Sequence, residues 1–144
     1  MKNTLLVLIA VLICFSCRKS EENVSTEKKA EKEFDMYEMS EMAMLMEQMY
    51  VDNEQLRQRI ESGDSIGKFP NHFLKIHKAV MTDKQENDAF FKAQAANFIQ
   101  SQELIYEDPK NAKEHFNKSI DACIQCHEVK CGGPIPRIKK LYIK

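Results

Sequence analysis

The stretch DPKNAKEHFNKSIDACIQCHEVKCGGP, at residues 108–134, carries helix signals at its start, along its length and at its end. Asp108 is a good N-cap, and Pro109 suits the first helical position. Residues 131–134, CGGP, then stop the helix, because glycine and proline disfavour its continuation. Between these ends, one face is predicted to carry an apolar stripe that also holds cysteine and histidine: Ala112, Phe116, Ile120, Cys123 and His127.

Three further helices are predicted before this one. The first spans residues 34–61 and stops at Gly63, and the second spans residues 70–81 with a proline in its first turn. The third is predicted to follow Thr82, which can cap it, with Gln85 placed for a capping box. The stripe of the first helix consists of Met39, Met42, Met46, Met49, Leu56 and Ile60. Four helices with one apolar face each predict an all-α fold, an antiparallel four-helix bundle.

The composition limits the class of protein. The chain has 144 residues, a net charge of −1, 43% hydrophobic residues and 30% charged residues. These values fit one globular domain, and they exclude a disordered chain and a multi-span membrane protein. The near-zero charge argues against a nucleic-acid binder that relies on bulk positive charge. The five cysteines are too few and too clustered for a disulfide framework.

The N-terminus has the pattern of an export signal. Residues 5–15 form an unbroken apolar run, too short to cross a hydrocarbon core of about 30 Å. A small residue and Cys17 follow, which resembles the signal of bacterial lipoproteins. The resemblance implies a signal peptide at residues 1–16, lipidation of Cys17 and a lipid anchor in the cell envelope, on the periplasmic side or at the outer membrane. Plain secretion, or a buried helix with an incidental cysteine, is the alternative. Residues 17–33 are polar, so we expect a flexible tether before a domain at residues 34–144.

Cys123, Cys126 and His127 form the motif C-x-x-C-H, which is the attachment pattern of haem c. At positions i, i+3 and i+4, all three side chains project from one face of a helix. Two thiols at this spacing can form thioethers with one haem, and the imidazole Nε2 can bind its iron. Three alternatives stay open: a zinc site of these residues with Cys131, a redox dithiol, or chance.

A C-x-x-C-H motif near the C-terminus, on the last of four helices, is similar to the class II cytochromes c, which include the cytochromes c′ and their low-spin relatives. The resemblance covers about residues 34–129. It implies that Cys123 and Cys126 hold the haem and that His127 is the fifth iron ligand. It also makes a homodimer through the first helices an option. Residues 131–144 extend beyond the usual end of the family.

The sixth iron ligand is sought on the first helix, which has six methionines between residues 36 and 49. In the low-spin relatives a methionine of this helix binds the iron, and a thioether ligand raises the reduction potential. Met46 is the best match by position, and Met49 and Met42 are alternatives one turn away. His77 on the second helix is the candidate for a bis-histidine site, and an open sixth position is the third option. Methionines also serve as adaptable packing against a large cofactor.

We therefore expect a membrane-anchored monohaem c-type cytochrome that passes single electrons to a redox partner protein. The sequence offers no nucleophile–base pair and no carboxylate pair, so no enzyme activity is expected. Two other functions stay open: a five-coordinate, gas-binding haem protein, and a zinc-stabilised or purely structural envelope lipoprotein. Four basic residues lie near the C-terminus, and three roles are open for them. They neutralise the haem propionates, form a docking patch for the redox partner, or simply belong to an exposed tail: Lys130, Arg137, Lys139 and Lys140.

Overall fold

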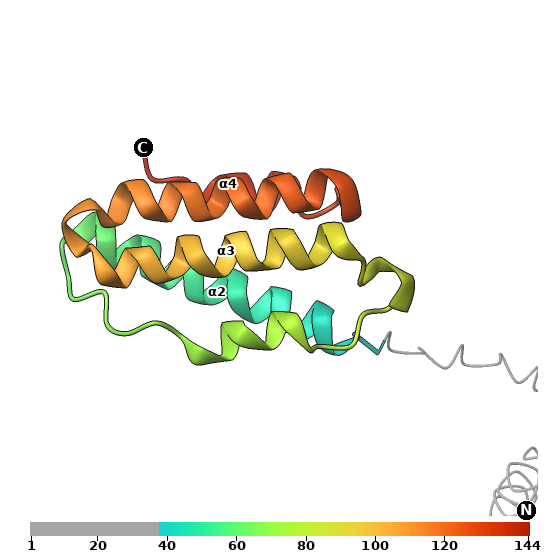
Figure 1. The fold of residues 1–144 in the computed structure, drawn as a ribbon. Coiled ribbons are helices and arrows are strands. Elements are labelled where there is room, and N and C mark those ends of the chain that lie inside the picture. The colour runs from blue at the N-terminus through green and yellow to red at the C-terminus, as the bar shows by residue number, and fades with distance from the viewer. Residues whose placement is uncertain (1–37) are drawn as a thin grey trace, which may run out of the picture. The chain divides into compact units, whose positions relative to one another are not determined.

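The computed structural model describes residues 38–144, and this part of the chain is mostly helical, without strands. Its three long α-helices are α2 at Glu41–Ser62, α3 at Ala89–Glu107 and α4 at Ala112–Lys130. Figure 1 shows that α2 and α3 run in one direction and that α4 runs in the other. The prediction of an all-α fold is confirmed.

Shorter helical segments lie in the connections and after α4. The 3-10 helices η1 at Asn71–His77, η2 at Lys84–Glu86 and η3 at Pro109–Asn111 precede α3 or α4. A single α-helical turn, α5 at Ile135–Ile138, and the 3-10 turn η4 at Lys139–Leu141 follow α4. The predicted start of the last helix at Pro109 is correct to within one turn, because η3 continues directly into α4.

A specific residue defines each end of α2. The Ser40 hydroxyl accepts a hydrogen bond of 3.2 Å from the Ala43 amide, so the helix begins at Glu41. Residues 38–40 are not helical, which corrects the predicted helix running on from residue 34. At the other end, Gly63 adopts the left-handed conformation with φ 72°, as a helix stop requires.

The predicted α-helix at residues 70–81 is wrong, because only the seven residues of η1 are helical, and these form a 3-10 helix. Phe73 and Ile76 are buried, and their spacing of three matches the three residues per turn of a 3-10 helix. Beyond η1, the Val80 carbonyl accepts a hydrogen bond of 3.0 Å from the Met42 amide, and the Val80 amide donates to the Glu41 carboxylate. The first turn of α2 therefore uses the backbone groups that a longer second helix would need.

The third helix begins seven residues later than the predicted cap at Thr82. The Asp88 carboxylate accepts a hydrogen bond of 2.8 Å from the Phe91 amide and caps α3. The Thr82 hydroxyl instead donates to the Ser40 hydroxyl at 3.1 Å, which ties this loop to the start of α2.

A buried polar layer joins the three long helices. The Gln102 amide of α3 donates hydrogen bonds to Asn53 Oδ1 of α2 at 2.6 Å and to Ser119 Oγ of α4 at 3.0 Å. On α2 and α3 these polar residues separate two apolar clusters, one around Phe91 and one around Phe116. Because a slip of any helix would break these bonds, the layer fixes the register of the three helices.

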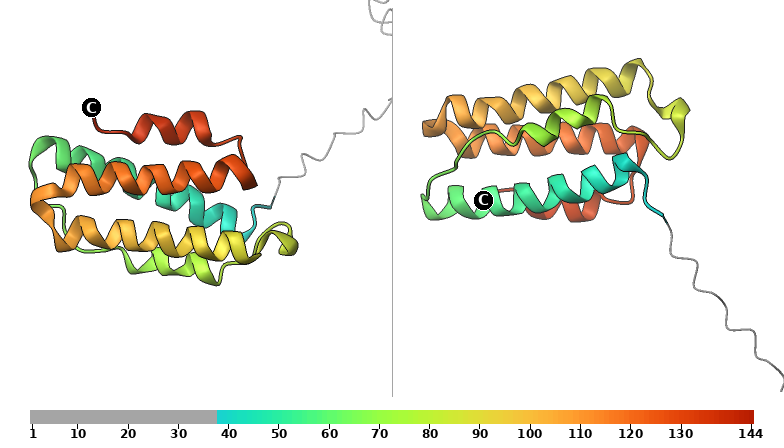
Figure 2. Two further views of the ribbon diagram at one scale, coloured as in Figure 1. Left: turned by 45° about the horizontal axis from the view of Figure 1, so that its top comes forward. Right: turned by 90° about the horizontal axis from the view of Figure 1, so that it is seen from below.

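The C-terminal segment at residues 131–144, which we call the strap, folds back along α4 and reaches α2 (Figure 2). Ile138, Leu141 and Ile143 are buried in the apolar cluster around Phe116. The strap is thus anchored in the core through these three apolar residues, while its basic residues Arg137, Lys139 and Lys140 are exposed.

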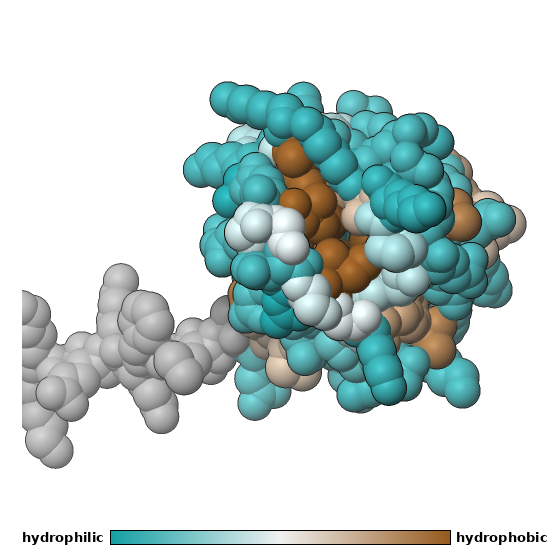
Figure 3. Space-filling model, turned by 90° about the vertical axis from the view of Figure 1, so that its left-hand side faces the viewer, coloured by the Kyte–Doolittle hydropathy of each residue, from teal (hydrophilic) through white to brown (hydrophobic). Residues whose placement is uncertain are grey.

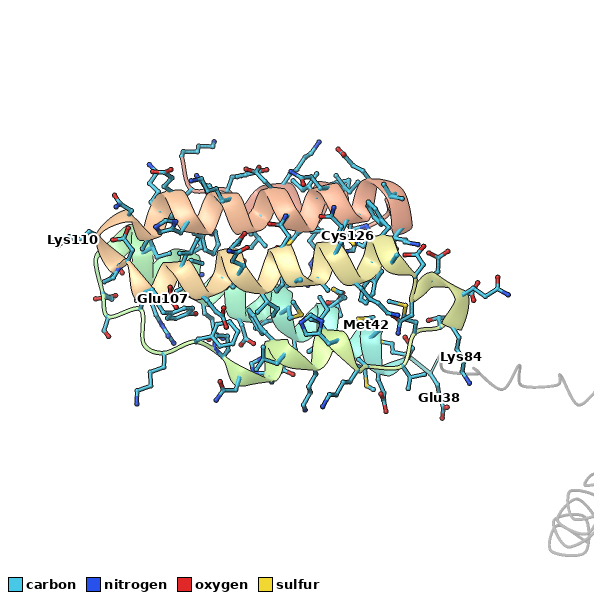
Figure 4. All side chains as sticks on the ribbon, in the orientation of Figure 1. Glu38, Met42, Lys84, Glu107, Lys110 and Cys126 are labelled. Carbon is cyan, nitrogen blue, oxygen red and sulfur yellow. The ribbon has the colours of Figure 1, made fainter. Side chains whose placement is uncertain are left out.

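The two ends of the described domain differ. Figure 3 looks onto the end where α3 leads into α4 and shows apolar surface in a hollow bordered by polar side chains. A cavity at this end is lined by Ile60, Ile66 and Ala112 together with Asp64 and Ser65. The C-x-x-C-H motif lies toward the opposite end, where Figure 4 labels Cys126 on α4 and Met42 on α2.

Candidate functional site

The C-x-x-C-H motif lies in the second half of α4, on the side that faces the core. Cys123 is packed against both apolar clusters, and Cys126 is packed against the cluster around Phe91. His127 follows in the same helical turn. The helix therefore presents two thiols and one imidazole to the same region, as the i, i+3, i+4 spacing predicts.

Three adjoining clefts surround the motif. The wide cleft lies between the start of α2, residues 81–86 and the end of α4, and it encloses about 1000 Å³ including the space at its mouth. The strap-side cleft extends between α2 and the strap, and the inner cleft extends toward α3. Met46 of α2 and His127 of α4 line all three clefts. The motif therefore borders three clefts, and Met46 brings a thioether to each of them from the opposite helix.

The His127 ring has a defined hydrogen bond. Its Nδ1 lies 2.9 Å from the Cys131 carbonyl oxygen. A carbonyl oxygen only accepts, so Nδ1 carries the proton and the Nε2 of a neutral ring keeps its lone pair. Histidines that bind metal commonly donate their other ring N–H to a backbone carbonyl in this way, which fixes the tautomer and makes the ligand more basic. The imidazole is thus prepared to coordinate through Nε2.

The two motif thiols lie in surroundings that disfavour the thiolate form. Burial raises the pKa of the Cys123 thiol to about 12, and the nearby Cys126 adds to this shift. Burial also raises the pKa of Cys126, against a smaller opposing effect of Lys130. A redox dithiol reacts as a thiolate, so this environment disfavours that alternative. All three cysteines of the described residues are free.

The four residues considered for zinc are not assembled into a site. Within residues 38–144, no three His, Cys, Asp or Glu side chains are placed to hold a metal ion. The Cys131 residue is exposed, and its carbonyl rather than its thiol contacts His127. Iron within a haem needs only axial ligands from the protein, and a single imidazole with a free Nε2 fits that need.

The candidates for the sixth ligand occupy different places. Met46 lines all three clefts, Met49 is buried and lines two of them, and Met42 is buried and lines the wide cleft alone. His77 is exposed at the end of η1 and is not among the residues that line the three clefts. By contrast, the Met44 side chain points away from the core and is 53% exposed. Among these candidates, Met46 is therefore the residue that shares the most clefts with His127.

Lys130 and Arg137, two of the basic residues expected near the propionates or in a docking patch, already form ion pairs with carboxylates. Lys130 Nζ lies 2.6 Å from the Asp88 carboxylate and 2.7 Å from the Glu86 carboxylate, at the mouth of the wide cleft. The hydrogen bond to Asp88, followed by that to Glu86, raises the pKa of Lys130. The same hydrogen bond lowers the pKa of Asp88, and the Phe91 amide adds to that effect. This clasp joins the end of α4 to the start of α3.

Gln94 of α3 is a site residue that the sequence did not reveal. Its Oε1 is buried without a hydrogen-bond partner, and it lines the inner cleft with Cys126 and His127. An unpaired buried acceptor in a cleft indicates a site that a bound group or an ordered water completes. Gln94 gives no sequence signal, because a glutamine beside an apolar stripe usually faces solvent.

Comparison of the chain with protein-family models, curated proteins and solved structures finds no significant match. Within residues 38–144, no helix has the combination of length and apolar character that crossing a bilayer needs. The predicted signal peptide, the lipidation site at Cys17 and the tether that ends at residue 33 lie outside the described residues.

Proposed function

We propose that this protein is a monohaem c-type cytochrome that carries single electrons at the cell envelope. Cys123 and Cys126 would hold the haem through thioethers, and His127 Nε2 would be the fifth iron ligand. When bound, the haem supplies an iron that cycles between Fe(II) and Fe(III). The observation that carries the proposal is the hydrogen bond from His127 Nδ1 to the Cys131 carbonyl, because it leaves Nε2 free in a helical turn that also presents two neutral thiols.

Met46 is the proposed sixth ligand. It comes from α2, opposite the motif, and is the only methionine that lines all three clefts within the described residues. A soft thioether sulfur favours the reduced iron and raises the potential. Met42 and Met49 would pack against the cofactor.

The arrangement proposed for the loaded protein is the antiparallel four-helix bundle of the class II cytochromes c, with the haem near the C-terminal helix. The 3-10 helix η1 would take the position of the second helix. Lipidation at Cys17 would anchor the domain to the membrane, and a redox partner protein would exchange electrons at the haem edge. We propose no enzyme activity, because electron transfer needs no catalytic side chain.

The absorption spectrum of the natively exported protein tests this proposal. The proposal predicts a low-spin c-type spectrum with a sulfur-to-iron charge-transfer band in the oxidised form. Met46→Leu should abolish that band and lower the potential, because leucine has nearly the same volume but offers no lone pair. Met44→Leu is the matched control, since this methionine is 53% exposed on the same helix, and it should change neither.

The other outcomes are equally informative. A band that survives in Met46→Leu rejects this residue as the ligand and turns the search to Met49 and Met42. A high-spin spectrum that carbon monoxide shifts would assign the gas-binding function, for which the open mouth of the wide cleft is the supporting feature. A protein without any haem absorption would reject the cytochrome and leave a structural envelope lipoprotein.

A further inference from the structure

The strap forms one wall of the candidate site. Pro134, Arg137 and Leu141 line the strap-side cleft, and Met46, Cys123 and His127 line it from α2 and α4. This segment lies beyond the part of the chain that resembles the class II cytochromes c. Its place beside the motif therefore needs an explanation from the structure alone.

Arg137 attaches the strap to α2 across the strap-side cleft. One guanidinium nitrogen donates hydrogen bonds to both carboxylate oxygens of Glu47, at 2.6 and 2.8 Å. The guanidinium carbon also lies 3.8 Å from the centre of the Tyr50 ring. An arginine that pairs with a carboxylate and stacks on an aromatic ring holds a fixed orientation, which a lysine could not do.

The strap begins with two glycines directly after the carbonyl that His127 uses. Neither Gly132 nor Gly133 has a positive φ, and added Cβ atoms would meet nothing within 4 Å, so no steric reason requires glycine at either position. Two consecutive glycines give the chain high conformational freedom. The Cys131 carbonyl can keep its position at the imidazole only if the chain is held both before and after Cys131. The end of α4 holds one side, where the Cys131 amide donates to the His127 carbonyl at 3.1 Å, and the docked strap holds the other.

We propose that the strap is a positioning device for the axial histidine and that Arg137 is its principal positioning residue. The strap keeps the Cys131 carbonyl on the Nδ1–H of His127, and this hydrogen bond fixes the ring and increases its basicity. The hydrogen bond is a property of the polypeptide. Its effect on the iron rests on the proposed function, since a more basic imidazole favours Fe(III) and lowers the potential.

Arg137→Gln tests the device without removing an apolar core residue. Lys140→Gln is the matched control, because it makes the same change of charge at another exposed position of the strap, and within residues 38–144 Lys140 has no ion pair. Glu47→Gln removes the other partner of the pair. The double exchange Glu47→Arg with Arg137→Glu keeps an ion pair across the cleft and should restore part of the effect.

The first readout is the ¹⁵N NMR spectrum of His127 in the full chain without haem. We expect one tautomer, with the proton on Nδ1, in the unaltered chain and in Lys140→Gln, and a mixture of tautomers in Arg137→Gln and Glu47→Gln. The second readout is the potential of the exported, haem-loaded protein. Arg137→Gln should raise it relative to Lys140→Gln, by up to about 59 mV, which corresponds to about a tenfold change in the ratio of oxidised to reduced protein.

The two readouts separate the two proposals. An unchanged tautomer and an unchanged potential in Arg137→Gln would overturn the positioning role. A changed tautomer in a protein that never acquires haem would support the strap as a device that orients His127 and would reject the cytochrome.

Discussion

Asn117 of α4 anchors the end of the strap, and its replacement by alanine should measurably loosen the fold. The Ile143 amide donates to Asn117 Oδ1 at 3.0 Å, and Asn117 Nδ2 donates to the Ile143 carbonyl at 3.0 Å. Two hydrogen bonds of about 0.5–1.5 kcal/mol each give a loss of about 1–3 kcal/mol. Alanine recovers up to about 0.7 kcal/mol through its higher helix propensity. The groups are only partly buried, so water replaces part of the rest, and the expected net cost is about 1 kcal/mol.

Urea unfolding of the full chain, followed by helical circular dichroism, measures this cost. With a slope of about 1–3 kcal/mol per molar urea, Asn117→Ala should lower the midpoint by roughly 0.3–1 M. Lys118→Ala is the control on the neighbouring position. It removes only an exposed i,i+4 pair with Glu114, worth about 0.3–0.5 kcal/mol, and gains helix propensity. Equal midpoints for the two variants would show that the strap is not held by this pair of bonds.

Two further stability predictions use the same assay. Gly63→Ala should cost about 1 kcal/mol, because Gly63 has φ 72°, whereas Gly132→Ala should be neutral or stabilising by up to about 1 kcal/mol, because that position has free space and no positive φ. Asp88→Asn keeps the cap on Phe91 but removes the ion pair with Lys130. Since the pKa of Asp88 is lowered from 3.8 and that of Lys130 is raised from 10.5, the pair stabilises the fold between these values. The stability advantage over Asp88→Asn should disappear as the pH falls through the lowered pKa of Asp88 and as it rises through the raised pKa of Lys130; an advantage independent of pH would contradict the assignment.

The sequence predicted those features that local chemistry determines. Gly63 ends α2 because a left-handed residue is needed there, and Asp108 with Pro109 marks the start of the last helix to within one turn. The C-x-x-C-H motif faces the core because its spacing matches the period of a helix. These features depend on neighbours within four residues, which the sequence displays directly.

The features that the sequence did not predict depend on contacts between distant segments. The second helix is short because α2 takes the backbone groups of Val80. The third helix begins after Asp88 because the Asp88 carboxylate caps it, whereas the Thr82 hydroxyl is bound to Ser40. Thr82 and Asp88 are both acceptable N-caps for that helix, and periodicity cannot choose between them. The strap was missed for the same reason, although the apolar spacing of Ile138, Leu141 and Ile143 was available as a signal.

The mass of the natively exported, mature chain, recorded after denaturation, tests the central claim most directly. The proposed function predicts the mass of the polypeptide and its lipid plus that of one haem, retained under denaturing conditions because two thioethers hold it. Cys123→Ser with Cys126→Ser should remove the haem increment and leave the lipid increment. A native chain that carries no haem mass would contradict the claim that this protein is a c-type cytochrome.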